Sequence, residues 1–176
     1  PLEGYLFPET YFVDEDAKPE DIITTMLNQF VKVYKGEYES RAEELGLTTD
    51  QVVTLASIVQ KEAKIKEEFP QISAVFHNRL RKKMPLESCA TIQYVTGKKS
   101  LILTNEETKI NSKYNTYKYK GLPIGPICCS GEMAIKAALF PQEEFMNPDK
   151  PYLYFVLKDP MKGSHAFNYD YKSHLE

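Results

Sequence analysis

The chain has 176 residues, of which 42% are hydrophobic and 27% are charged, and its formal net charge is −3. This length and composition suit one domain with a well-filled core, and the small net charge excludes a chain-wide surface for nucleic acid. Three cysteines and three widely separated histidines fit neither a disulfide framework nor a metal-binding spacing. We therefore expect no cofactor, no metal and no nucleic-acid partner.

The N-terminal region predicts an extended segment followed by helices. Residues 4–13 are aromatic and β-branched, which predicts a strand interrupted at Pro8. An apolar stripe that begins at Pro19 predicts a long amphipathic helix, since proline is favoured in a first turn. A short polar helix over about 37–45 is expected to end at Gly46.

The next two helices follow from clear capping and periodicity signals. Thr48 with Gln51 three residues later is a capping-box pattern, and it starts the helix that contains "LASIVQKEAK". A further helix is predicted over about 70–83 and must end before Pro85. The apolar stretch 86–97, "LESCATIQYVTG", is compatible with either a helix or a strand.

The C-terminal half is richer in turn signals. The polar stretch 97–113 predicts a loop or small excursion, and 114–131 predicts an ordered irregular loop. We expect Ser130 to cap a helix over 131–139, and the chain to end in two strands around a turn at 160–163. Strands at both ends with helices between them indicate an α+β fold, with amphipathic helices packed on a small, mostly antiparallel sheet.

One carboxylate lies on the apolar face of its helix. At about 100° per residue, Glu62 falls between Ile58 and Leu55, whereas Gln60 falls on the flank. A carboxylate on an inward face must be paired, hydrogen-bonded, neutral or open to a cleft. From periodicity alone, two interpretations explain Glu62 equally well: a structural carboxylate that pairs with a lysine or arginine or caps a backbone group, and an acid with a raised pKa.

Other candidate residues are weaker when each is taken alone. A glycosidase needs an acid with a raised pKa and usually a second carboxylate, for which Glu3, Glu9 and Glu87 are candidates by position. Asn78 either faces the same cleft as Glu62 or is a polar flank residue. His165 is either a turn or core histidine or a groove residue, and the "NTY" stretch offers donors suited to sugar hydroxyls.

Six stretches, taken together and in order, resemble the YceG-like family of endolytic murein transglycosylases. They read "LEGYLFPETY", "LASIVQKEA", "VFHNRL", "MPLESCATIQY", "YNTYKYKGLPIGPI" and "PYLYFVLKD" with "GSHAFN". The resemblance implies a single catalytic domain over 1–176, with an open glycan-binding groove. It also implies a lyase that cleaves the β-1,4 bond between N-acetylmuramic acid and N-acetylglucosamine and leaves a 1,6-anhydro end.

The resemblance places the catalytic residue in a helix motif that often reads "SIVEKE", in which Gln60 replaces the first glutamate here. The helical wheel favours Glu62 as the catalytic residue, acting first as acid and then as base. We expect Glu62 at the wall of an open groove near the 114–126 loop. The substrate-binding residues that the resemblance implies are Glu3, Glu9, Gln60, Asn78, Gln93, Tyr94, Asn115, Thr116, Tyr117 and His165.

The resemblance also implies a cellular context. Members carry one N-terminal membrane helix, and we expect such an anchor outside this chain, which we read as an excised domain. They act on the outer face of the cytoplasmic membrane beside wall-synthesis proteins, and a LysM-like segment that often precedes the catalytic part is not expected here. Two other functions stay open: a non-catalytic glycan-binding module, if Gln60 holds the position of the acid, and a muramidase that hydrolyses with water.

Overall fold

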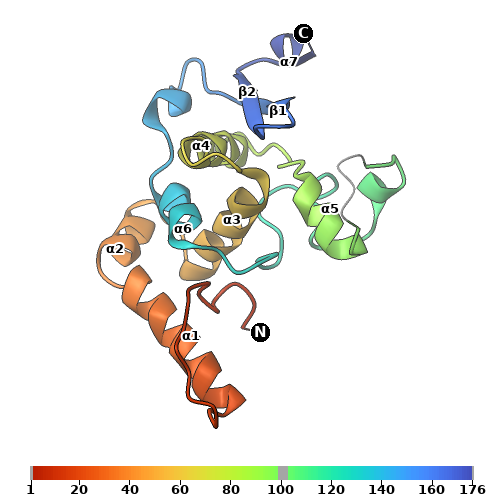
Figure 1. Cartoon of the computed structure of the whole chain (residues 1–176). Helices are drawn as coiled ribbons and strands as arrows, with labels where there is room; N and C mark the ends of the chain where they lie inside the picture. The colour runs from red at the N-terminus through yellow and green to blue at the C-terminus, as the bar shows by residue number, and fades with distance from the viewer. Residues whose placement is uncertain (1, 99–102, 176) are drawn as a thin grey trace.

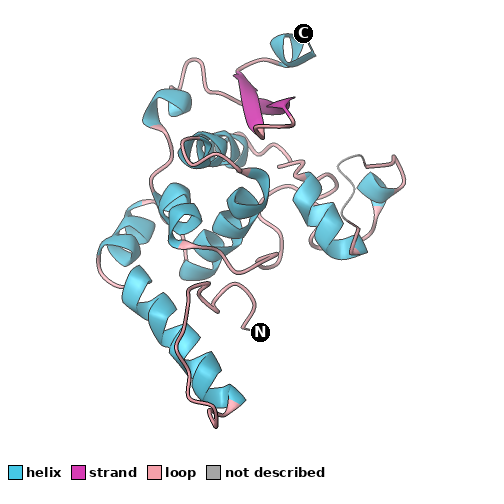
Figure 2. Cartoon of the chain, viewed as in Figure 1, coloured by secondary structure: helices cyan, strands magenta, loops and turns pink. Residues whose placement is uncertain are grey.

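The structure is a computed structural model that describes residues 2–98 and 103–175. Helices dominate the chain, and a two-stranded sheet lies near its C-terminal end (Figures 1 and 2). This arrangement confirms the α+β fold class. The α-helices are α1 (Pro19–Tyr34), α2 (Glu37–Glu44), α3 (Thr49–Glu62), α4 (Glu68–Arg81), α5 (Cys89–Thr96), α6 (Glu132–Leu139) and α7 (Tyr171–Leu175). The 3-10 turns are η1 (Glu107–Lys109) and η2 (Glu143–Met146), and the strands are β1 (Tyr154–Asp159) and β2 (Ser164–Asn168).

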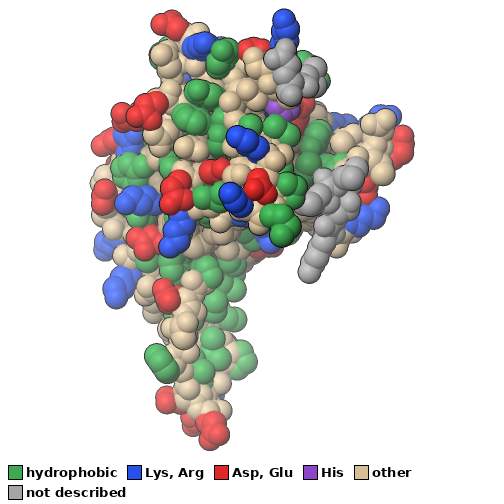
Figure 3. Space-filling view, turned by 45° about the horizontal axis from the view of Figure 1, so that its top comes forward, with side chains coloured by type: hydrophobic (Ala, Val, Ile, Leu, Met, Phe, Trp, Pro, Cys, Tyr) green, Lys and Arg blue, Asp and Glu red, His purple; other side chains and the backbone are tan. Residues whose placement is uncertain are grey.

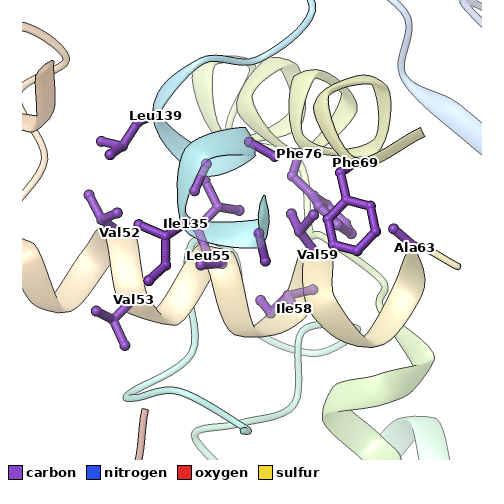
Figure 4. Close-up of a cluster of buried hydrophobic side chains, with 14 of the residues drawn as sticks. Val52, Val53, Leu55, Ile58, Val59, Ala63, Phe69, Phe76, Ile135 and Leu139 are labelled. Atoms are coloured by element: carbon purple, nitrogen blue, oxygen red, sulfur yellow. The ribbon is translucent and has the colours of Figure 1, made fainter. Parts of the chain in front are cut away.

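Helix α3 is the centre of the hydrophobic core. Every residue from 52 to 59 is buried, so this helix is enclosed around its whole circumference rather than on one face. Helices α4 and α6 pack on it, and Figure 4 shows Phe76 of α4 and Ile135 of α6 meeting the α3 side chains. Each fully buried side chain of this size contributes roughly 1.5–3 kcal/mol of hydrophobic stabilisation.

The start of α3 confirms the capping box that the sequence predicts. The Thr48 hydroxyl accepts from the Gln51 backbone N–H at 3.3 Å, and the Gln51 side chain accepts from the Thr48 N–H at 2.8 Å. These bonds satisfy amide groups that have no partner within the first turn of a helix.

The N-terminal segment is not the strand that was predicted over 4–13. Among the described residues no strand pairs with it, and it runs as turns and extended chain beside α1 (Figure 1). Two of its aromatic residues pack against the core, since Phe7 is buried and the Tyr5 ring meets Phe30 edge-on at 5.1 Å, whereas Phe12 is exposed. Gly4 has a φ of +90°, and a Cβ atom there would lie 2.5 Å from Pro126, so this close approach requires glycine.

The start of α6 also differs from the prediction. The N-cap residue is Gly131, and no side chain of its own segment caps the helix, so the expected cap by Ser130 is wrong. The Gly131 N–H instead donates to Gln60 Oε1 at 3.1 Å. A side chain from α3 therefore satisfies the N-terminus of α6, which sequence-local capping rules do not reveal.

The C-terminal hairpin forms as predicted and is tied to α4. Strands β1 and β2 pair antiparallel, with Leu157 opposite His165, and turn between 160 and 163. Asn78 donates to the carbonyl oxygens of Phe145 and Tyr152, each at 2.8 Å, and its side chain is fully buried. The expectation that Asn78 contacts substrate is therefore wrong, because its amide anchors the segment that leads into β1.

Charged side chains of both signs lie interspersed on the face of the molecule shown in Figure 3. Within residues 2–98 and 103–175, no helix has the length and apolarity needed to cross a membrane, and no group of His, Cys, Asp or Glu has an arrangement that could hold a metal ion.

The capping box gives a stability prediction. Thr48→Ala removes the hydroxyl that accepts from Gln51, so the free energy of unfolding should fall by about 1 kcal/mol. Urea denaturation followed by circular dichroism measures it. Thr24→Ala, at an exposed position within α1, is the matched control and should change stability by less than about 0.5 kcal/mol. Equal losses for the two variants would show that the capping box does not stabilise α3.

Candidate active site

A pocket of about 210 Å³ lies where the C-terminal end of α3 meets α5 and the hairpin. Three residues that the sequence singled out, Glu62, Gln93 and His165, line it together although they are far apart in the chain. The other lining residues are Lys61, Lys64, Cys89, Ala90, Phe155, Val156 and Leu157. Glu62 is the only carboxylate among the described residues that line this pocket.

Glu62 is partly buried and is held by hydrogen-bond donors rather than by a cation. The Ser88 hydroxyl donates to its carboxylate, and the Ala90 backbone N–H, in the first turn of α5, also bonds it. No described lysine or arginine forms an ion pair with it. The ion-paired form of the structural alternative is therefore not what the structure shows, whereas its other form, a carboxylate that accepts from a backbone group, is present at the Ala90 N–H.

The pKa of Glu62 is set by opposing effects. Burial raises the pKa above the ordinary value of a glutamate, because desolvation penalises the charged form. The bonds from Ser88 and Ala90, and the nearby His165, act in the opposite direction. The N-terminus of α5 also favours a negative charge at this position. The carboxyl is thus biased toward its neutral form while its ionised form keeps specific partners.

Ser88 is held in place by a strained turn and a buried threonine. Glu87 adopts a left-handed backbone with φ of 54°, and its carboxylate pairs with Arg79 at 2.8 Å. The Thr116 carbonyl accepts from the Glu87 N–H, and its hydroxyl accepts from the Ser88 N–H, both at 3.1 Å. Glu87 therefore helps to hold Ser88 in position and is not a second acid in the pocket.

The "NTY" stretch of the 114–126 loop does not line the pocket. Asn115 and Thr116 are each only 1% exposed, and the Asn115 side chain bonds backbone groups of Thr108, Ile110 and Tyr117. The expectation of direct glycan contact is wrong for these two residues, because their polar groups already bind the protein. Tyr117 approaches the pocket more closely, with its hydroxyl 3.0 Å from the Cys89 sulfur.

His165 is oriented by a carboxylate that sequence reasoning missed. Glu68 accepts from the His165 backbone N–H at 2.8 Å and contacts the ring Nδ1 at 2.7 Å, and both side chains are almost fully buried. This contact places the proton on Nδ1 and fixes the ring, whose other edge belongs to the pocket lining. Ser88 was also missed; it becomes visible in sequence only if 89–96 is recognised as a helix with Ser88 as its N-cap.

The remaining predicted residues lie outside this pocket. Gln60 bonds Gly131 at the start of α6, so it does not occupy a position equivalent to that of Glu62. Glu3 accepts from the Tyr94 hydroxyl at 2.6 Å, beside a second pocket. Glu9 is exposed and lines neither pocket, so its role toward the glycan stays a prediction.

Comparison with known proteins identifies the family. The model of the YceG-like family matches residues 1–176. The chain belongs to the YceG-like family. It is 40% identical over 179 residues to the endolytic murein transglycosylase of Bacillus subtilis (strain 168), covering 99% of this chain and 46% of that protein. It is 38% identical over 143 residues to an endolytic murein transglycosylase of Streptococcus pneumoniae (strain D39), covering 78% of this chain and 26% of that protein.

A solved structure of the YceG-like family supports the fold. The crystal structure of a YceG-like protein from Listeria monocytogenes superposes with a TM-score of 0.84 at 34% identity, covering 99% of this chain and 54% of that chain. This YceG-like chain therefore spans about half the length, or less, of these relatives.

The environment of Glu62 predicts a shift that does not depend on activity. Ser88→Ala removes a donor that stabilises the ionised carboxyl, so the pKa of Glu62 should rise further. Titration of the Glu62 carboxyl carbon by ¹³C NMR measures this pKa. Ser40→Ala, at an exposed position on α2, should leave it unchanged. A pKa that falls or stays constant in Ser88→Ala would contradict the assigned hydrogen bond.

Proposed function

We propose that this domain cleaves peptidoglycan glycan strands internally, as a lytic transglycosylase. The bond broken is the β-1,4 bond between N-acetylmuramic acid and N-acetylglucosamine, and the product carries a 1,6-anhydro end. The names of the relatives support the class of reaction. The observation that carries the proposal is Glu62, a carboxyl with a raised pKa at a pocket where no other described lining residue is acidic.

One carboxyl is sufficient for both proton transfers of this reaction. Protonated Glu62 donates its proton to the glycosidic oxygen as the bond from that oxygen to C1 of the muramic acid breaks. The 6-hydroxyl of the same muramic acid then attacks C1 and gives its proton to the Glu62 carboxylate. The acid is regenerated, a ring closes between O6 and C1, and no water is consumed.

The surroundings of Glu62 suit both of its protonation states. Desolvation favours the neutral acid before the first transfer. After that transfer, the Ser88 hydroxyl, the Ala90 N–H and the α5 N-terminus stabilise the carboxylate. The residue can therefore move between the two states at a modest free-energy cost within one turnover.

The two other functions receive less support. A glycan-binding module without activity requires Gln60 at the position of the acid, but its amide faces α6. A muramidase that uses water normally needs a second carboxylate about 5–10 Å from the first. Among the described residues no second carboxylate lines the pocket, since Glu68 bonds His165 and Glu87 pairs with Arg79.

The cellular setting is a further part of the proposal. Peptidoglycan lies outside the cytoplasmic membrane, so we infer that the domain acts on the outer face of that membrane. Attachment would come from an N-terminal anchor outside residues 1–176, and wall-synthesis proteins would be its neighbours. The curated relatives, which are about twice as long or longer, leave room for such segments.

The assignment of Glu62 is tested by an isosteric substitution. Glu62→Gln should lower cleavage of purified peptidoglycan by about 10²- to 10⁴-fold, since it removes the proton donor. Gln60→Ala is the control and should cost much less, with folding checked by thermal denaturation because it removes the bond to Gly131. Mass spectrometry of the products should show anhydro ends. Free reducing ends would indicate hydrolysis, and retained activity in Glu62→Gln would refute the assignment.

The raised pKa predicts the direction of the pH dependence. The neutral form of Glu62 performs the first transfer, so kcat/KM should fall as pH rises through its folded-state pKa, which lies above the ordinary value. The measurement is kcat/KM against pH on a defined glycan strand, with folding verified at each pH. A plateau that extends far above neutral pH, with no descending limb, would contradict a protonated Glu62 as the donor.

A further inference from the structure

A second and larger pocket, of about 460 Å³, opens nearer the N-terminal end of α3. It is lined by Glu3, Tyr5, Asp50, Thr54, Tyr114, Ile124, Gly125 and Pro126. Thr54 precedes Glu62 on the same helix by about 12 Å of axis, at roughly 1.5 Å per residue. The pocket therefore lies within the reach of one extended substrate from the candidate active site.

Helix α5 links the two pockets. Gln93 lines the first pocket, and the next residue, Tyr94, contacts two residues that line the second. The Tyr94 hydroxyl donates to Glu3 at 2.6 Å, and its ring lies 4.8 Å from that of Tyr114. On the α3 side, the Cys128 thiol contacts the carbonyl of Ser57, between the residues that line the two pockets. The bond between Tyr94 and Glu3 thus connects the linings of the two pockets.

The two pocket linings carry different charged residues. Lys61 and Lys64 line the first pocket, whereas Glu3 and Asp50 line the second, where no described lining residue is a lysine or arginine. No ion pair among the described residues neutralises either acid. A cationic group is therefore repelled at the first pocket and attracted at the second.

The partners of these two acids are neutral phenols. The Tyr94 hydroxyl donates to Glu3, and the Tyr5 hydroxyl donates to Asp50. A phenol donates one proton and leaves the carboxylate charged, with further lone pairs available to a ligand. The pKa of Tyr94 is raised, first of all by its bond to Glu3, which reflects the negative charge there. The aromatic faces beside these acids add a surface that favours a cation over a neutral group.

We propose that the second pocket binds a primary ammonium group on the peptide that the glycan strand carries. This inference rests on the proposed function, because it takes the peptide to hang from a muramic acid held near Glu62. Three to four extended residues span about 10–14 Å, which matches the separation along α3. Glu3 and Asp50 supply the charge, and the tyrosine rings pack against the carbon chain that bears the amine.

The test compares two ligands that differ only in the charge of that amine. Full-length protein carrying Glu62→Gln is titrated by calorimetry with soluble glycan oligomers whose peptides end in a free amine, and with the same oligomers after N-acetylation. The free-amine oligomer should bind about tenfold more tightly. Adding Glu3→Gln with Asp50→Asn should abolish this preference. Adding Glu15→Gln with Asp16→Asn, an equal change in charge at an exposed site, should preserve it.

Each outcome is informative about the pocket itself. Equal affinity for free and acetylated oligomers would overturn the proposal even if the double variant failed to fold, since that comparison uses the unaltered pocket. If oligomers without peptide bound as tightly as the free-amine oligomers, the pocket would be a neutral sugar subsite. That result would also overturn the proposal. Binding is measured without cleavage, so this result is independent of whether anhydro products form.

Discussion

The complete burial of α3 is the constraint on which the rest of the structure depends. A helix enclosed along 52–59 must be covered on every side, so α4, α6, the 126–128 loop and the N-terminal segment are all packed against it. The buried Ser57 hydroxyl shows how closely this covering fits, because it accepts from the Ile127 N–H at 3.0 Å. The two ends of α3 leave this enclosure, and the C-terminal end carries Glu62.

The candidate active site follows from where the buried helix ends. Glu62 keeps the inward direction of the apolar stripe, so its carboxyl is desolvated by the core and still opens to a pocket. The N-terminus of α5 faces it from across that pocket, with the Ser88 hydroxyl and the Ala90 N–H as donors. Core packing raises the pKa and the facing helix limits the rise, which is the balance that a residue acting as both acid and base requires.

Gln60 and Glu62, two positions apart near the end of α3, bind different partners. Gln60 turns to α6 and satisfies the Gly131 N–H, which a carboxylate at the same position would also do. Replacing glutamate with glutamine there keeps an acceptor for that amide. The glutamine at position 60 is therefore compatible with the bonds that hold Glu62.

The sequence by itself determined the helices with clear caps and periodicity, the C-terminal hairpin and the inward position of Glu62, because those features depend on local spacing. The pairing of His165 with Glu68 and the capping of α6 by Gln60 were decided only by the tertiary structure, since each joins distant segments. The segment 4–13 was misjudged because a strand needs a partner, and the burial of Asn78 was missed because its backbone partners lie about 70 residues away. Local patterns specify elements, whereas the environment of a side chain depends on which elements pack around it.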